Sequence, residues 1–343
     1  MTIPLNRRDF LQQATLGTLC AGLSTSGLGS HVFANQEQGK KEPDLDFQAT
    51  LPIVDTHEHL WDLTKFNLPW TKGNDVLGRS FVTKDYLAAT QGLHVVKSVY
   101  MEVDVDPAQQ VQEAQYAIDL CRRDDNPMLG AVISGRPASP DFRTYITKFK
   151  DSPFIKGVRQ VLHGPSNPAG FCLDKQFVKS VQLLGELGMS FDLCLRSGEL
   201  ADGEKLVAQC PHTRFVVDHC GNMDVEETDA KKRQVWMDGM QSLAQHENVV
   251  CKISGIIVTA KKDWKAADLE PNMRFCMETF GPDRRMFAGD WPVCTLRASY
   301  RQWVQALKEI VHGMHMPPAD QKKLFHDNAV RFYALQDKGY KAS

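Results

Sequence analysis

Short apolar stretches alternate regularly with longer amphipathic ones along most of this chain. Eight stretches have the length and β-branched content of buried strands. They cover 51–54, 95–103, 129–133, 155–162, 190–195, 215–218, 249–253 and 286–288. Between them apolar residues recur at helical spacing, as in the stripe of Phe177, Val181 and Leu184 that ends at Gly188. A final helix is expected over 319–334.

Strands separated by helices must pair in parallel through right-handed crossovers. Eight such units over 49–338 predict one (β/α)8 TIM barrel, whose reactive groups lie at the carboxyl ends of the strands. Polar side chains capable of chemistry do follow the apolar strands. They are His57, His59, Glu102, Arg136, Arg159, His163, Arg196, His219, Lys252 and Asp290.

The first strand ends in two histidines one residue apart, His57 and His59. Alternate side chains of a strand share a face, so both imidazoles are expected to point the same way. Such a pair can hold a divalent metal or polarise an anionic oxygen. The competing interpretation places one histidine in the core and the other in a solvated loop.

The N-terminal segment has the pattern of an export signal. Arg7-Arg8 is followed by Phe10-Leu11, a weakly apolar stretch and the ending Val32-Phe33-Ala34. We expect a twin-arginine signal peptide over 1–34, a polar linker over 35–48 and a periplasmic mature protein. The apolar stretch is too short for a stable membrane span, so no membrane association is expected of the mature form. A chance arginine pair in an ordinary N-terminus is the alternative.

Composition narrows the class of partner. The chain carries 40 basic and 42 acidic residues, a net charge of −2, with no basic stripe. Nucleic acid is therefore not expected as a partner, and a small-molecule substrate is. The nine cysteines include no C-x-x-C pair, which favours small buried hydrophobes over a disulfide framework or zinc knuckle. The sequence does not decide whether the protein forms an oligomer.

Four ordered motifs carry a family resemblance. They are His-Glu-His-Leu-Trp-Asp at 57–62, Lys-Gly-Val-Arg at 156–159, Asp-His-Cys-Gly at 218–221 and Gly-Asp-Trp-Pro at 289–292. Together they resemble the amidohydrolase-2 branch of the amidohydrolase superfamily, and within it the sugar lactonases that open L-fuconolactone and L-rhamnonolactone. The ending at 324–333 is also typical of that branch. The resemblance spans about 50–335.

The resemblance implies a hydrolase that opens a lactone or cyclic ester of a small, sugar-derived acid. Asp290 would activate water, and His57, His59 and His219 would polarise the carbonyl. They would do so directly or through one divalent ion, zinc or manganese, held by His57, His59 and Asp290 and also open to His219. The expected fifth strand lacks the histidine of the related decarboxylases, and Lys156 begins its strand rather than ending it. A binuclear site is therefore not expected, and a metal-independent site stays open.

Five further residues are candidates for substrate binding. Arg159 and Arg196 suit a carboxylate or polyol, His163 could protonate the leaving oxygen, and Trp61 and Trp291 could stack on a sugar face. The arginines and His163 have plainer alternatives. The arginines could be ion-pair partners of Asp192 or Glu102, and His163 could be a loop residue. Equally, Asp290 could cap a helix and His219 could be a satisfied core histidine.

Two other functions remain open from the sequence. The same barrel could serve as a mononuclear metal-dependent decarboxylase or hydrolase of another small organic acid. It could also bind a ligand without turnover. The fold alone does not decide between these functions.

Overall fold

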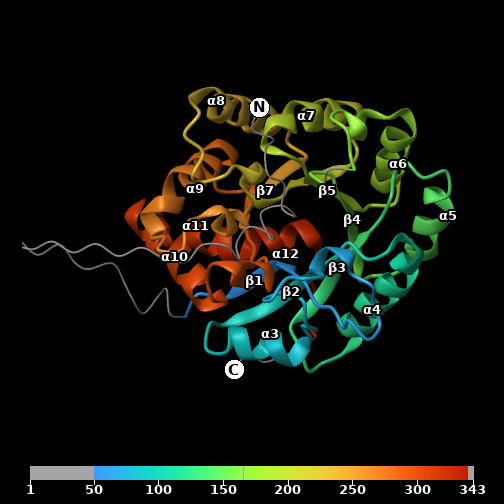
Figure 1. Cartoon of the computed structure of the whole chain (residues 1–343), viewed down its shortest axis with the longest axis horizontal. Helices are drawn as coiled ribbons and strands as arrows, with labels where there is room; N and C mark the ends of the chain where they lie inside the picture. Colours follow the sequence, from blue (N-terminus) through green and yellow to red (C-terminus); the bar gives the residue numbers. More distant parts are fainter. Residues whose placement is uncertain (1–49, 165, 339–343) are drawn as a thin grey trace, which may run out of the picture.

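Eight parallel strands form the centre of the computed structural model, which describes residues 50–164 and 166–338. The predicted signal peptide and linker, 1–34 and 35–48, lie outside the described residues. The strands are β1 (Ile53–Glu58), β2 (Val95–Met101), β3 (Met128–Ser134), β4 (Ile155–Val161), β5 (Ser190–Cys194), β6 (Arg214–Val217), β7 (Val249–Ile253) and β8 (Arg285–Phe287). They pair in chain order from β1 to β8 (Figure 1).

The sheet closes on itself between its first and last strands. The backbone N–H of His59 donates to the carbonyl of Trp291 at 2.8 Å, and Glu58 forms a parallel bridge with the same residue. This closure confirms the predicted (β/α)8 barrel. It also brings the histidines that end β1 beside Asp290, which follows β8.

Helices cover the outside of the barrel, as Figure 1 shows. They are α3 (Thr83–Thr90), α4 (Gln110–Arg122), α5 (Phe142–Ile146), α6 (Lys175–Glu186), α7 (Leu200–Gln209), α8 (Ala230–Ala244), α9 (Ala266–Phe280), α10 (Tyr300–Gly313), α11 (Pro318–Lys322) and α12 (Asn328–Tyr333). The stripe predicted on α6 is buried at Phe177, Val181 and Leu184. No helix within the described residues is both long and apolar enough to cross a membrane.

The expected single helix over 319–334 is instead divided. A π-helical turn, Lys323–Asp327, separates α11 from α12. The consecutive side chains of Leu324 and Phe325 are both fully buried, and the Phe325 ring packs on Phe287 of β8 at 5.4 Å. The wider turn lets two neighbouring apolar residues face the barrel, which a regular α-helical turn separates by about 100°.

An apolar plug fills the amino-terminal end of the barrel. Valines from five strands pack with Met101, Met286 and three residues near the end of the described chain, and the set is Val54, Val99, Val132, Val216, Val250, Ala329, Tyr333 and Leu335. This plug closes the amino-terminal end and leaves polar chemistry to the opposite end of the barrel. The eight cysteines among the described residues are buried and form no disulfide with one another, as the sequence predicts.

Candidate active site

His57 and His59 lie together inside the barrel mouth. Their Nε2 atoms are 3.1 Å apart, which confirms that both imidazoles face the same way. The strand is anchored just before them by Asp55. Its carboxylate accepts the backbone N–H of His57 at 3.0 Å and the hydroxyls of Tyr86 and Tyr300, from α3 and α10. These buried bonds fix the strand whose end carries both histidines.

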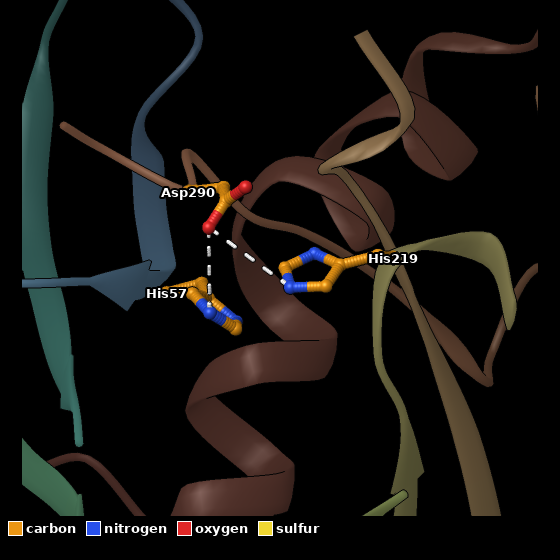
Figure 2. A group of neighbouring side chains, drawn as sticks. All are labelled: His57, His219 and Asp290. Carbon is orange, nitrogen blue, oxygen red and sulfur yellow. Dashed lines mark ion pairs between the residues drawn. The ribbon is translucent and has the colours of Figure 1, made fainter. Parts of the chain in front are cut away.

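Asp290 gathers three imidazoles around one carboxylate oxygen. Its Oδ1 lies 3.4 Å from Nε2 of His59, 3.6 Å from Nε2 of His57 and 3.9 Å from Nε2 of His219. Figure 2 shows this carboxylate facing the rings of His57 and His219. All four side chains are nearly fully buried. Asp290 therefore faces the imidazoles, and the 3-10 turn after it, Val293–Leu296, takes Pro292 as its N-cap.

The spacing of these atoms fits a single divalent metal ion. Nitrogen and oxygen ligands about 2.1 Å from a tetrahedral ion lie about 3.4 Å from each other. The measured separations to Asp290, 3.4 to 3.9 Å, are close to that value, and His57, His219 and Asp290 all lie within 4.8 Å of one another. The positive charge of Arg159 would repel a cation at this position, because its Nη1 lies 3.1 Å from Nε2 of His57.

The other ring nitrogen of each imidazole is also engaged. Nδ1 of His59 lies 3.1 Å from the carbonyl of Met101, and Nδ1 of His219 lies 2.9 Å from Oγ of Ser254. Nδ1 of His57 lies 3.6 Å from a carboxylate oxygen of Asp218. Such outer partners fix the tautomer and orientation of metal-binding or catalytic histidines. These partners leave the three Nε2 atoms directed toward Asp290.

A buried ionic cluster supports His57 from beneath. Nζ of Lys252 on β7 donates to Asp192 on β5 at 2.6 Å and lies 3.3 Å from Asp218 at the end of β6. Burial alone would raise the pKa of Asp218, but the charge of Lys252 holds it well below its usual value. Burial, assisted by Lys252, lowers the pKa of His57 well below its usual value. His57 is therefore neutral, as a metal ligand or a hydrogen-bond acceptor must be.

Arg159 crosses the barrel from β4 to Glu102. Its Nε donates to the Glu102 carboxylate at 2.7 Å and its Nη2 to the Glu102 carbonyl at 2.9 Å. The ion-pair alternative from the sequence is therefore present here. The same guanidinium also reaches His57 and lines the cavity above the site.

A cavity of about 290 Å³ opens over the β1–β4 side of the mouth. Its polar lining comes from strand ends and the loops after them: His59, Asp104, Asp106, Arg136, Arg159, Gln160, His163, Ser166 and Asn167. Its apolar wall includes Trp70 and Val293. Of the histidines predicted from the sequence, His59 belongs both to the Asp290 cluster and to the cavity lining, and His163 lines the cavity outside that cluster.

Three predicted substrate contacts do not line the cavity. Trp61 is fully buried, donates its indole N–H to the carbonyl of Arg79 and packs on Trp70. Trp291 is buried against Phe81 and Tyr86 at the seam where the barrel closes. Both indoles therefore pack against other rings in the interior and are not exposed for stacking on a sugar.

Arg196 is engaged beside the cavity rather than in it. Its Nη1 bonds both carboxylate oxygens of Glu199, at 2.7 and 2.8 Å, and its Nη2 donates to the carbonyls of Gly164 and Asn167. Arg196 thus fastens the loop after β4, whose residues line the cavity. The sequence alternatives for its partner, Asp192 and Glu102, are not the residues it contacts.

Asp104 is a cavity residue that the sequence did not single out. Its backbone has a positive φ of 48°, a strained conformation for a residue with a side chain. Oδ1 of Asp104 accepts a hydrogen bond from Nη2 of Arg136 at 2.8 Å. The available signal was its position two residues after Glu102, within the loop that follows a strand.

Characterised proteins of similar sequence act on sugar lactones. L-fucono-1,5-lactonase of Burkholderia multivorans is 26% identical over 295 residues, covering 83% of this chain and 96% of that protein. L-rhamnono-gamma-lactonase of Scheffersomyces stipitis is 25% identical, covering 82% of this chain and 98% of that protein. The expected resemblance to sugar lactonases is thereby confirmed at low identity.

The fold also matches that of a solved amidohydrolase from Burkholderia multivorans with bound zinc. The TM-score is 0.74 at 23% identity, over 83% of this chain and all of that one. The family model described as Amidohydrolase matches residues 54–335, nearly the whole barrel. This chain therefore belongs to the amidohydrolase family and is a hydrolase.

Proposed function

We propose that this protein opens the ring of a sugar-derived lactone by hydrolysis. The observation that carries the proposal is the Asp290 carboxylate, held within 3.9 Å of three imidazoles beside a polar cavity. Lactone hydrolysis needs a base for water, a polarised carbonyl and a proton for the leaving alkoxide. The two lactonase relatives support this chemistry over other reactions of the same barrel.

Asp290 is the general base in this proposal. Its carboxylate takes a proton from the attacking water, and the surrounding imidazoles hold it next to His59, which lines the cavity. A divalent ion held by His57, His59, His219 and Asp290 would supply a Lewis acid for the carbonyl. Without an ion, His59 can donate a hydrogen bond from Nε2 to the carbonyl oxygen only as an imidazolium, because its Nδ1 already donates to the carbonyl of Met101.

His163 is assigned the proton for the leaving alkoxide. It lines the cavity across from Trp70, in the loop fastened by Arg196. The paired side chains of Arg136 and Asp104 line the remaining space, together with Arg159, whose partner Glu102 is fully buried. They offer donors and acceptors to hydroxyl groups on the substrate ring.

The proposal is tested by incubating the purified protein with a panel of aldonolactones and of small carboxylic acids. Ring opening consumes base, so a pH-stat measures it, while decarboxylation releases CO2. We expect base consumption with at least one aldonolactone and no CO2. Release of CO2 from an acid, without lactone opening, would instead support the metal-dependent decarboxylase.

Export to the periplasm is a separate part of the proposal. It is supported by the twin-arginine pattern at Arg7 and Arg8. Fractionation of cells that express the full chain tests it, with Arg7→Lys/Arg8→Lys as the matched control. We expect the wild type in the periplasm and the variant retained in the cytoplasm, whereas equal retention of both would contradict export.

A further inference from the structure

A charged pair in the cavity wall stands apart from the reacting groups. Oδ1 of Asp104 and Nη2 of Arg136 are 2.8 Å apart, and both side chains are partly exposed, Asp104 at 42% and Arg136 at 23%. Both residues line the cavity, whereas Asp290 is not among its lining residues. Because the pair remains open to the cavity, a ligand there meets a carboxylate and a guanidinium together.

The pair is held in place by the backbone and by buried neighbours. Nη1 of Arg136 donates to the carbonyl of Gly135 at 2.9 Å and to Oγ of Ser134 at 3.1 Å. The backbone N–H of Asp104 donates to Oε2 of Glu102 at 2.7 Å, and its φ is 48°. A strained backbone that is fixed by a buried carboxylate is often found where a side chain must be aimed.

An indole wall completes the same part of the cavity. Trp70 donates its N–H to the carbonyl of Val103 at 2.8 Å, which fixes the ring beside the loop that carries Asp104. The ring packs edge to face on buried Trp61. A flat apolar wall next to a carboxylate and a guanidinium presents the complementary surfaces of a sugar ring, with its C–H face and its hydroxyl edge.

We propose that Asp104 and Arg136 form a specificity subsite that selects neutral polyhydroxylated lactones and rejects lactones bearing a carboxylate. This inference rests on the proposed lactonase function and deepens it. A hydroxyl group donates to Asp104 and accepts from Arg136, so it satisfies both members of the pair. A substrate carboxylate can bond only Arg136 and is repelled by Asp104, which is the discriminating element against anions.

The charges that surround the subsite also favour a neutral ligand over an anionic one. Arg159, the other guanidinium in the cavity wall, is bonded to Glu102 through Nε and Nη2. Asp106 adds a second carboxylate to the wall. The arginines of the cavity are thus matched by acidic groups, and no surplus of positive charge awaits an anionic substrate among the residues that line it.

The test measures binding apart from turnover. Lactones are titrated calorimetrically into Asp290→Asn protein, with one neutral aldonolactone series and one series that carries an additional carboxylate. In this background we expect Asp104→Asn to weaken neutral lactones about 10- to 100-fold, the loss of one charge-assisted hydrogen bond. Carboxylated lactones should bind more tightly, so the preference between the two series falls or reverses.

Two further variants separate subsite chemistry from general effects. Arg136→Met should weaken neutral lactones and should weaken carboxylated lactones further, because the carboxylate loses its one partner in the pair, so the preference for neutral lactones increases. Asp119→Asn removes an exposed carboxylate on α4 that pairs with Arg122, and it should leave the preference unchanged. Opposite shifts in preference for Asp104→Asn and Arg136→Met would support the subsite.

Failure of the inference and failure of the proposed function give different results. If Asp104→Asn leaves the ratio of neutral to carboxylated affinity unchanged, or if no lactone of either series binds, the subsite is overturned. If the preference shifts as expected but the protein with Asp290 intact opens no lactone, the subsite stands and the hydrolytic function is rejected.

Discussion

Nη1 of Arg159 lies 3.1 Å from Nε2 of His57, while Nε of the same guanidinium donates to Glu102 at 2.7 Å. Both charged side chains are almost completely buried, Arg159 at 2% exposure and Glu102 at 0%. The pair therefore joins His57 to the residue that follows β2, and its integrity should govern the stability of the barrel mouth.

Replacing Arg159 with Met should destabilise the fold strongly. The Glu102 carboxylate would remain buried without its cation, which costs about 3–5 kcal/mol in the free energy of unfolding. The double variant Arg159→Met/Glu102→Gln removes both charges and should recover much of that loss. Chemical denaturation of both variants measures the difference. Equal stabilities for the single variant and the wild type would show that the pair contributes nothing.

Gly255 should be required for the position of His219. Its φ is +72°, and a Cβ there would lie 2.2 Å from Nδ1 of the His219 ring. Gly281 provides a matched control, because its φ is +68° and a Cβ would meet nothing within 4 Å. Gly281→Ala should cost about 1–3 kcal/mol of backbone strain, because its φ of 68° and ψ of 178° lie in a region that residues with a side chain avoid.

By contrast, Gly255→Ala should also displace the imidazole and lower kcat about 10- to 100-fold. Lactone turnover and the free energy of unfolding are measured for both variants. If both alanines affect activity equally, Gly255 has no particular relation to His219.

Glu113 should make the fold less stable as the pH rises. Burial, reinforced by nearby Glu102, raises its pKa to about 8 from an ordinary value of 4.5. Between these values the unfolded chain loses a proton that the folded chain keeps, so unfolding becomes easier from about pH 4.5 to about pH 8. Each unit of pKa difference corresponds to about 1.4 kcal/mol.

Glu113→Gln removes that titration while keeping an oxygen for Tyr100 and for the backbone N–H of Val103. Relative to the wild type, the variant should gain stability between pH 5 and pH 8 by roughly 1–4 kcal/mol. Glu186→Gln, which alters an exposed carboxyl on α6, should show the same difference at both pH values. A pH-independent difference for Glu113→Gln would contradict the expected direction.

We expect the histidines that surround Asp290, but not His163 in the cavity lining, to bind a divalent ion. Elemental analysis should find about one divalent ion per wild-type chain after loading with zinc, with four candidate ligands. His219→Ala should lower zinc affinity at least 10-fold by removing one ligand. His163→Ala, which changes a cavity histidine outside the cluster, should keep it. Equal retention by both variants would place the ion elsewhere.

The alternation of strands and helices was readable because the apolar strands are short and regularly spaced. The pairing of His57 with His59 followed from strand alternation, and the approach of Asp290 followed from barrel closure. These relations depend only on periodicity and topology, which a sequence records directly.

Contacts between distant strands were less accessible. Lys252 meets Asp192 across 60 residues, and no local pattern marks them as partners. Trp61 follows the histidine pair closely, yet its ring turns into the packing around Phe81. Side-chain direction in irregular loops depends on tertiary packing, so proximity in sequence did not predict which indole lines the cavity.

The central claim is that Asp290 activates water for lactone opening. The most direct measurement is kcat on the best aldonolactone for the wild type and Asp290→Asn, with lactone affinity measured by calorimetry on the variant. We predict that kcat falls at least 1,000-fold, about 4 kcal/mol in activation free energy, while the lactone still binds. Turnover by Asp290→Asn within about 10-fold of the wild type would contradict the claim.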